Sequence, residues 1–227
     1  LEAAQRGASA ATPREQLHVN ALEAWCALDL AGATAAWEEC TRAYPMDVLA
    51  VKMLHYSHFY MGDSVNVRNS VGRVWHAWEG REDLPTYGYM LSMRAFGLEE
   101  TGDYARAESL GRAAASLNEA DAWAVHTVAH VCEMEDRQTD GVAWLDSKGG
   151  YGNWNNFRYH LVWHKALMLF EAGRHDDVLA LYDDGMFDPK SDEYLDLTND
   201  ISVLARLELE GVDVGDRWGV MGEKAKG

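Results

Sequence analysis

A segment of 34 residues that recurs along the chain constrains the fold more than any other feature of this sequence. The clearest copy begins at Gly88 and reads GYMLSMRAFGLEETGDYARAESLGRAAASLNEAD. A first helix is expected to end near Gly102. Small side chains on one face of the next helix, at Ala107, Gly111 and Ala114, would let the two helices approach closely. Two helices joined by a tight glycine turn within 34 residues are typical of the tetratricopeptide repeat.

The glycine turn sets the register of the other repeats. With Gly102 at position 15, the repeats start near residues 14, 48, 88, 122 and 159. The spacings are 34, 40, 34 and 37 residues, so insertions of six and three residues are expected. They fall at about 78–87 and 147–156, and both segments are rich in Gly, Pro or Asn, as loops are.

The sequence therefore predicts an all-α protein, a tetratricopeptide-type α-solenoid of about five helix pairs plus a C-terminal capping helix over about 191–210. That makes about eleven helices and no sheet. The presence of only four prolines agrees with a helical chain. We expect residues 1–227 to form a single helical-repeat domain, because a solenoid grows by adding repeats.

The charge of the chain argues against two classes of partner. It carries 20 basic and 37 acidic residues, a net charge of −17, and no basic patch is visible. A nucleic-acid partner and an anionic membrane surface are both disfavoured, and the acidity favours solubility. Three cysteines without metal spacing, and no signal peptide or transmembrane run, predict a cytoplasmic protein.

One face of the first helix in each repeat is rich in aromatic residues and histidines. In this repeat, helix positions 2, 5, 9 and 12 usually face the concave groove. Two interpretations stay open: a ligand cavity, apolar with a few polar groups, or a groove filled by its own side chains. The candidate ligand-binding residues are Tyr56, Phe59, Tyr89, Phe96, Trp123, His126, His130, His160, Trp163 and His164.

Four of the nine histidines form two matched pairs, His126 with His130 and His160 with His164. Residues four apart share a helix face, and the first helices of successive repeats pack side by side. We therefore expect His126, His130 and His164 to lie close together. Glu133 should be near them, with His160 at the edge of the group.

Several chemistries suit such a cluster. It could be a hydrogen-bonded network that holds two helices in register, a polar ligand-binding patch, a metal site, or an acid–base site, since the pKa of histidine lies near neutrality. The candidate catalytic residues are His126, His130, Glu133 and His164. We predict no metal and no other cofactor, because Trp123 and Trp163 would occupy the same groove.

Long segments of the sequence resemble the tetratricopeptide repeat protein 38 family. They read LHYSHFYMGDSVNVRNSVGRVWHAW, YGYMLSMRAFGLEETGDYARAESLGRAA, DAWAVHTVAHVCEM, and RYHLVWHKALMLFEAG followed by ALYDD. The likeness runs from about Gln16 to Trp218. It implies a helical-repeat fold and a cytosolic location, whereas the family has no defined biochemical activity.

The resemblance also bears on the histidines. In the family pattern, the segment similar to DAWAVHTVAHVCEM keeps both histidines, the glutamate and Met134. The segment similar to RYHLVWH usually reads closer to HNWWH, so His160 and His164 match while Leu161 and Val162 depart. That departure changes the polarity of the groove and leaves the identity of its ligand open.

Three functions fit these observations. The first is a binding protein that takes a small molecule or a peptide segment in an aromatic- and histidine-lined groove. The second is an enzyme that acts on a small hydrophobic or aromatic substrate through the cluster of His126, His130, Glu133, His160 and His164, with or without a metal. The third is a structural adaptor. The first is favoured, because no complete catalytic motif is visible.

Overall fold

The computed structural model describes residues 1–7, 10–148, 157–191 and 193–226, and these contain thirteen α-helices and no β-strand. The prediction of an all-α chain is confirmed. The helices are α1 (Glu2–Gly7), α2 (Pro13–Cys26), α3 (Leu30–Ala43), α4 (Val48–Tyr60), α5 (Ser64–Val74), α6 (Tyr87–Glu99), α7 (Tyr104–Leu117), α8 (Ala122–Met134), α9 (Gln138–Ser147), α10 (Phe157–Glu171), α11 (His175–Leu181), α12 (Tyr194–Leu209) and α13 (Arg217–Lys224). Two shorter helical turns are η2 (Trp75–Ala77) and η4 (Tyr182–Met186).

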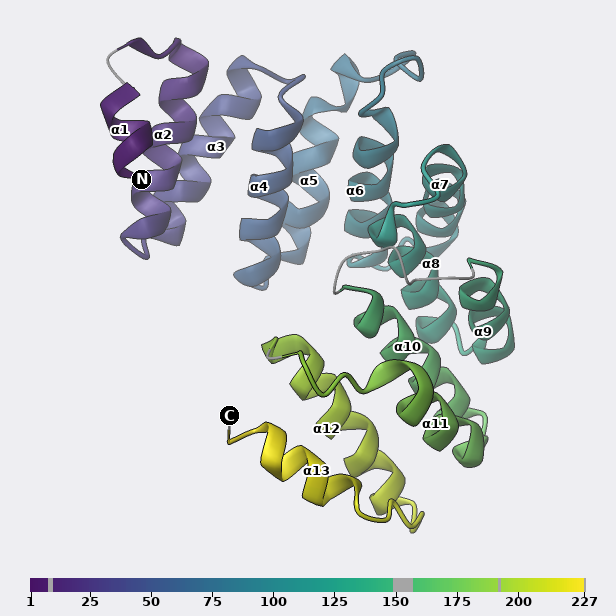
Figure 1. Cartoon of the computed structure of the whole chain (residues 1–227). Coiled ribbons are helices and arrows are strands. Elements are labelled where there is room, and N and C mark those ends of the chain that lie inside the picture. Colours follow the sequence, from purple (N-terminus) through teal and green to yellow (C-terminus); the bar gives the residue numbers. More distant parts are fainter. Residues whose placement is uncertain (8–9, 149–156, 192, 227) are drawn as a thin grey trace. The chain divides into compact units, whose positions relative to one another are not determined.

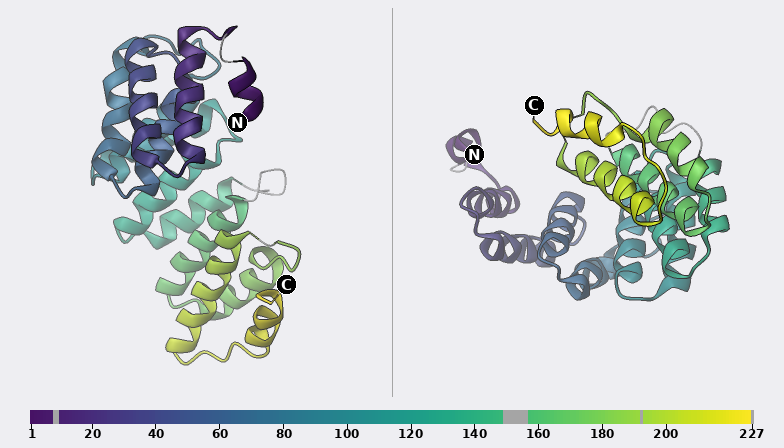
Figure 2. Two further views of the ribbon diagram at one scale, coloured as in Figure 1. Left: turned by 90° about the vertical axis from the view of Figure 1, so that its left-hand side faces the viewer. Right: turned by 90° about the horizontal axis from the view of Figure 1, so that it is seen from below.

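The chain divides into two compact units, unit 1 (Leu1–Thr127) and unit 2 (Val128–Gly227), with the boundary inside α8. In unit 1 the antiparallel helices follow one another in chain order, as Figure 1 and the further views in Figure 2 show. The organisation of residues 1–227 as one domain stays a prediction.

The first helix of every repeat begins within two residues of the position that the sequence predicts. The predicted starts were 14, 48, 88, 122 and 159, and the helices α2, α4, α6, α8 and α10 start at 13, 48, 87, 122 and 157. The predicted capping helix is α12. The count of eleven was low because α1 and α13, of only six and eight residues, lie outside the five helix pairs and the capping helix.

All five turns between the two helices of a repeat share one backbone geometry. Position 15 has a positive φ in each of them: Leu28 60°, Gly62 69°, Gly102 82°, Asp136 59° and Gly173 71°. The next residue donates its N–H to the carbonyl five residues earlier, as from Asp103 to Leu98 at 2.9 Å. This left-handed ending satisfies carbonyls at the helix end, and its recurrence confirms the register of the repeat.

The structure describes the whole of the first predicted insertion and only the first two residues of the second. The first, over 78–87, contains a turn at Gly80 with a φ of 72° and leads into α6. The second, over 147–156, lies outside the described residues except for Ser147, which ends α9, and Lys148. Within the described part of the chain, no helix has the length and apolar character needed to cross a membrane.

Each unit has an apolar core between its helices. In unit 1, one buried cluster joins α2, α3 and α4 and contains Ala21, Trp37, Cys40 and Leu54 among others. In unit 2, a larger cluster joins α10, α11, η4, α12 and α13. The histidines of α10 lie on a helix that contributes several side chains to this second core, so the core fixes their positions.

The contact between α5 and α6 in unit 1 requires a residue without a side chain at Gly97. A Cβ there would lie 2.6 Å from the Cα of Arg68 and 3.1 Å from the carbonyl oxygen of Val67, both backbone atoms. We expect Gly97→Ala to lower the free energy of unfolding by about 1–3 kcal/mol, because the two helices must move apart. Urea denaturation followed by circular dichroism measures this loss.

The matched control lies on the same helix. A Cβ at Gly88 would meet nothing closer than the Cβ of Leu117 at 3.6 Å, which is ordinary contact. Gly88→Ala should therefore leave stability unchanged or raise it by up to about 1 kcal/mol, through the higher helix propensity of alanine. Equal destabilisation by both substitutions would contradict the close approach of α5 and α6.

Candidate functional site

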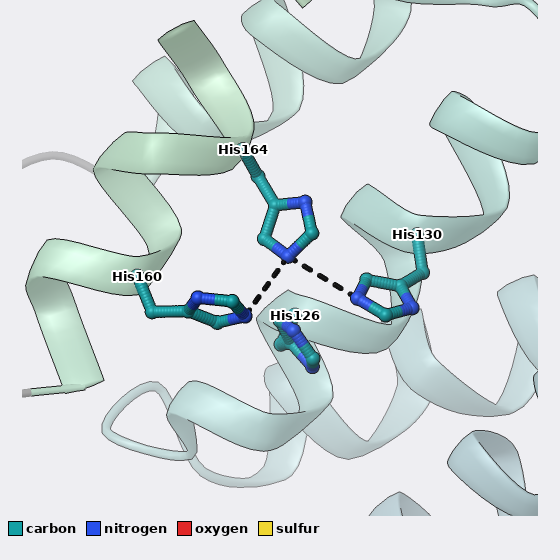
Figure 3. A group of neighbouring side chains, drawn as sticks. All are labelled: His126, His130, His160 and His164. Atoms are coloured by element: carbon teal, nitrogen blue, oxygen red, sulfur yellow. Dashed lines mark hydrogen bonds between the residues drawn. The ribbon is translucent and has the colours of Figure 1, made fainter. Parts of the chain in front are cut away.

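Three histidines of unit 2 turn their Nε2 atoms toward one another. His130 comes from α8, and His160 and His164 come from α10. The Nε2 atom of His164 lies 3.2 Å from that of His130 and 3.1 Å from that of His160. Figure 3 shows the rings of His130 and His160 approaching His164 from either side. We call these three residues the histidine cluster.

A carboxylate of α8 fixes the orientation of the central ring. The Nδ1 atom of His164 lies 2.8 Å from Oε2 of Glu133, and the His164 side chain is buried. Burial holds the pKa of His164 well below its usual value, and the neighbouring His130 acts in the same direction. A neutral His164 therefore donates its Nδ1 proton to Glu133 and keeps a lone pair on Nε2.

His160 takes part in the cluster, although we expected it at the edge of the group. Its Nδ1 atom lies 3.4 Å from the side-chain amide of Asn199, a buried residue of α12. Its ring stacks on Trp163, with centroids 5.1 Å apart and planes 17° from parallel. Burial lowers the pKa of His160 to about 3, helped by His164 and His130. Like His164, His160 is neutral at pH 7.

Glu133 is less exposed to water than a surface glutamate. Burial raises the pKa of its carboxyl, while the nearby His130, His160 and Arg206 act in the opposite direction. A carboxylate can accept a hydrogen bond from the N–H of a neutral imidazole, which orients the ring and strengthens its basicity. The structure thus brings together His130, Glu133, His160 and His164 as the sequence predicts, without yet deciding their role.

His126 stands one helical turn before His130 on α8 and is the fourth histidine drawn in Figure 3. It is buried, and within unit 1 its ring packs against Phe96 and Trp123, at centroid distances of 5.8 and 5.3 Å. His126 therefore belongs to the aromatic contacts of unit 1.

Those aromatic residues form one connected set on α4, α6 and α8. Phe96 lies 5.7 Å from Phe59 and 5.2 Å from Trp123 between ring centroids, and Trp123 lies 5.6 Å from Tyr56. Tyr60 adds to the set, 5.8 Å from Phe59. We call these five residues the aromatic surface. Among its members, Phe96 is buried, while Phe59 and Tyr60 are 38% and 65% exposed.

Helix α4 presents a stripe of side chains that continues the aromatic surface. Leu49, Lys52, Tyr56, Phe59 and Tyr60 follow the spacing of one helix face, and Leu49 is exposed. The ammonium group of Lys52 lies over the rings of Tyr56 and Trp123, 4.3 and 4.6 Å from their centroids. Two aromatic rings of this surface thus already hold a cation.

Two predicted ligand-binding residues, one in each unit, are not members of the aromatic surface. Tyr89 lies on α6 and lines a cavity of about 420 Å³ with Leu84 and Leu117. Trp163 belongs to unit 2, where it stacks on His160 and its Nε1–H donates to Ser202 Oγ at 3.2 Å. Tyr89 and Trp163 occupy groove positions 2 and 5 of their repeats, so a predicted groove position alone does not place a residue in the aromatic surface.

Sequence reasoning missed two partners of the site. Asn199 lies on the capping helix, which no repeat register covers, so no spacing pointed to it. Tyr60 is the last residue of α4 and occupies position 13, outside the four groove positions. The run HYSHFY, with aromatics at successive turns of the α4 stripe, was the signal that could have found Tyr60.

A second group of metal-ligating residue types lies in unit 1. His18 Nε2 is 2.9 Å from Asp47 Oδ2, and Cys40 Sγ is 3.9 Å from the same oxygen. Arg14 Nε also lies 2.8 Å from it, and Asp47 accepts from the N–H of Ala50 to cap α4. A carboxylate already bound by a guanidinium and a helix N-terminus is a structural ion pair.

Comparison with solved structures agrees with the helix pairs. TTC0263, a tetratricopeptide repeat protein of Thermus thermophilus, superposes with a TM-score of 0.60 at 15% sequence identity, over 86% of this chain and 99% of that chain. The MamA protein gives a TM-score of 0.56 at 10% identity, over 88% and 96% of the two chains. A double mutant of MamA from RS-1 also gives 0.56, at 11% identity over 85% and 94%.

The chain has the tetratricopeptide fold. At such low identity this similarity establishes the fold and nothing about ligands. No family model matches the sequence, so the resemblance to the tetratricopeptide repeat protein 38 family stays a prediction.

Proposed function

We propose that this tetratricopeptide protein binds a cationic peptide segment of another protein on the aromatic surface of unit 1. The observation that supports this function is the exposed stripe of α4, which runs from Leu49 to Tyr60 and continues into the rings of α6 and α8. Twelve residues of helix span about 18 Å, a length that suits an extended or helical peptide better than a small molecule.

The charge of the chain favours a basic partner. A net charge of −17 attracts cations over a longer range than side-chain contact. At the surface itself, Lys52 already packs its ammonium group over Tyr56 and Trp123, so a basic residue of the peptide would pack on the exposed rings of Phe59 and Tyr60. A peptide with Lys or Arg next to apolar residues would use both properties.

Selection from a phage-displayed library of random dodecapeptides tests this proposal. We expect the selected peptides to combine basic with aromatic or aliphatic residues. The double variant Phe59→Ala/Tyr60→Ala should bind the selected peptides at least about ten-fold more weakly, because exposed aromatic residues often dominate the energy of such interfaces. Fluorescence anisotropy of the labelled peptides measures the affinity.

A tyrosine of unit 2 provides the matched control. Tyr194 is 80% exposed and begins α12, so Tyr194→Ala removes an exposed tyrosine ring from unit 2. Affinity should then stay within about two-fold of the unmodified protein. Enrichment of acidic peptides, or an equal loss in the Tyr194→Ala protein, would exclude the aromatic surface as the binding site.

The histidine cluster supports a second candidate, an enzyme acting on a small hydrophobic or aromatic substrate. The proximity of His130, His160 and His164 to Glu133 favours it. A general base works best with a pKa near the operating pH, whereas the pKa of His160 is lowered to about 3. Neutral imidazoles are poor acids and bases under such conditions, but they are good metal ligands. Catalysis by this cluster would therefore depend on a metal.

A further inference from the structure

We propose that His130, His160 and His164 bind a single Zn²⁺ or similar divalent transition-metal ion through their Nε2 atoms, with Glu133 orienting the central ligand. All three ligands and the glutamate belong to unit 2. The proposal is independent of peptide binding, since it concerns other residues and another kind of ligand.

The spacing of the nitrogen atoms fits one ion. Zinc binds histidine nitrogen at 2.0–2.1 Å in tetrahedral geometry, so two ligand nitrogens on one ion lie about 3.3–3.4 Å apart. The Nε2 atom of His164 lies 3.2 and 3.1 Å from its two neighbours. Movements of a few tenths of an ångström would bring each of these two pairs to the distance found in a zinc centre, and the ligand atoms of all three histidines lie within 4.8 Å of one another.

Proton accounting at His164 favours a metal over a purely hydrogen-bonded network. Its Nδ1–H is directed at Glu133, so its Nε2 atom carries a single lone pair. That lone pair faces two Nε2 atoms at hydrogen-bond distance. One lone pair cannot make two good hydrogen bonds to separate donors, whereas a metal ion accepts one lone pair from each of the three rings.

The hydrogen-bond partners of the Nδ1 atoms of His160 and His164 agree with metal ligation. Histidines that bind metals usually donate their other ring N–H to a carboxylate or another acceptor, which fixes the tautomer. Glu133 does this for His164. Asn199 does the same for His160 when its amide oxygen, rather than its NH₂ group, faces Nδ1. The two orientations of the amide differ only by exchange of its O and N atoms.

One of the two side chains that we expected to prevent metal binding, Trp163, lies beside the cluster rather than within it. Trp163 stacks flat on the ring of His160 and donates its Nε1–H to Ser202, so it does not stand between the Nε2 atoms. Stacking on the imidazole leaves the edge that carries Nε2 directed at His164. Three imidazole nitrogens suit Zn²⁺, Cu²⁺, Fe²⁺ or Ni²⁺ and disfavour Mg²⁺ and Ca²⁺, which prefer oxygen.

The test uses the full chain, stripped with a chelator and titrated with Zn²⁺ alone in competition with a chromophoric chelator. We expect one equivalent to bind, and Co²⁺ in its place to give the intense visible bands of tetrahedral coordination. His130→Gln and His160→Gln, which alter half-buried rings, should each weaken Zn²⁺ binding at least about 100-fold, because each removes a direct ligand. Glu133→Gln should weaken it about 10–100-fold, the usual effect of losing an orienting partner.

Two control variants separate this site from adventitious binding and from the other histidine group. His175→Ala removes a ring of unit 2 that packs on Phe170, and His18→Gln removes one member of the group with Cys40 and Asp47. Both should bind Zn²⁺ like the unmodified protein, and circular dichroism checks that every variant is folded. Substoichiometric binding, loss of binding in either control, or full affinity in the folded His130→Gln and His160→Gln proteins would overturn the proposal.

Discussion

Replacing Trp78 by Ala is expected to lower the free energy of unfolding of unit 1 by about 3–5 kcal/mol. The indole is 1% exposed, and its Nε1–H donates to the carbonyl of Pro45 at 2.9 Å. It thereby connects the loop between α3 and α4 to the segment that follows η2. The substitution would leave a large cavity and take away the donor bonded to a carbonyl. Urea denaturation followed by far-ultraviolet circular dichroism measures the loss.

A second substitution at the same position divides the effect into its two causes. Trp78→Phe keeps much of the apolar volume but removes the Nε1–H that Pro45 accepts. It should cost about 1–3 kcal/mol, less than the alanine variant, because part of the packing survives. Little change in the alanine variant would mean that this indole does not hold the two loops together.

Trp78 also shows where sequence reasoning about the fold reaches its limit. The spacing between turns predicted an insertion over 78–87, and loops are usually exposed. A spacing reports how many residues are inserted but not which of them turn inward. The five turns within the helix pairs could be predicted, because a residue with a positive φ recurs at position 15 of each repeat. Leu28 and Asp136 could be placed there only because Gly62, Gly102 and Gly173 set the register.

The histidine pairs show the corresponding limit for the site. The i, i+4 spacing predicts which rings share a helix face, and the repeat predicts that α8 and α10 are neighbouring first helices. It cannot predict which nitrogen of each ring faces its neighbour, because that depends on acceptors from other segments. Glu133 was within reach of helical spacing, whereas Asn199 lies on α12, beyond the last repeat.

The second substitution with a large expected effect on stability breaks an ion pair between α12 and α13 in unit 2. Lys224 Nζ lies 3.2 Å from Asp200 Oδ2, and the two side chains are 8% and 2% exposed. Lys224→Met keeps the apolar stem and leaves the buried carboxylate without its partner. We expect the free energy of unfolding to fall by about 3–5 kcal/mol at pH 8, as when one member of a buried pair is removed.

This loss should depend on pH in a defined direction. Burial raises the pKa of Asp200 to about 6, although Lys224 acts to lower it, and the unfolded value is about 3.9. A carboxyl with a raised pKa in the folded state favours folding when protonated, so its contribution is present below about pH 4 and is lost as the pH rises through 6. Without the ammonium group, the pKa of Asp200 in the folded protein rises further. The stability that protonation of Asp200 provides is then lost only at higher pH.

The difference between the unmodified protein and Lys224→Met should therefore be largest at pH 8 and shrink to less than about 1 kcal/mol near pH 4, where Asp200 is protonated in both proteins. Titration of the buried histidines affects both proteins alike and cancels in the comparison. The double variant Asp200→Asn/Lys224→Met carries no buried charge at this position and should recover most of the stability at pH 8. A penalty that is the same at pH 4 and pH 8 would show that Lys224 acts through the contact of its ammonium group with the Phe187 ring, 4.8 Å from the centroid, rather than through Asp200.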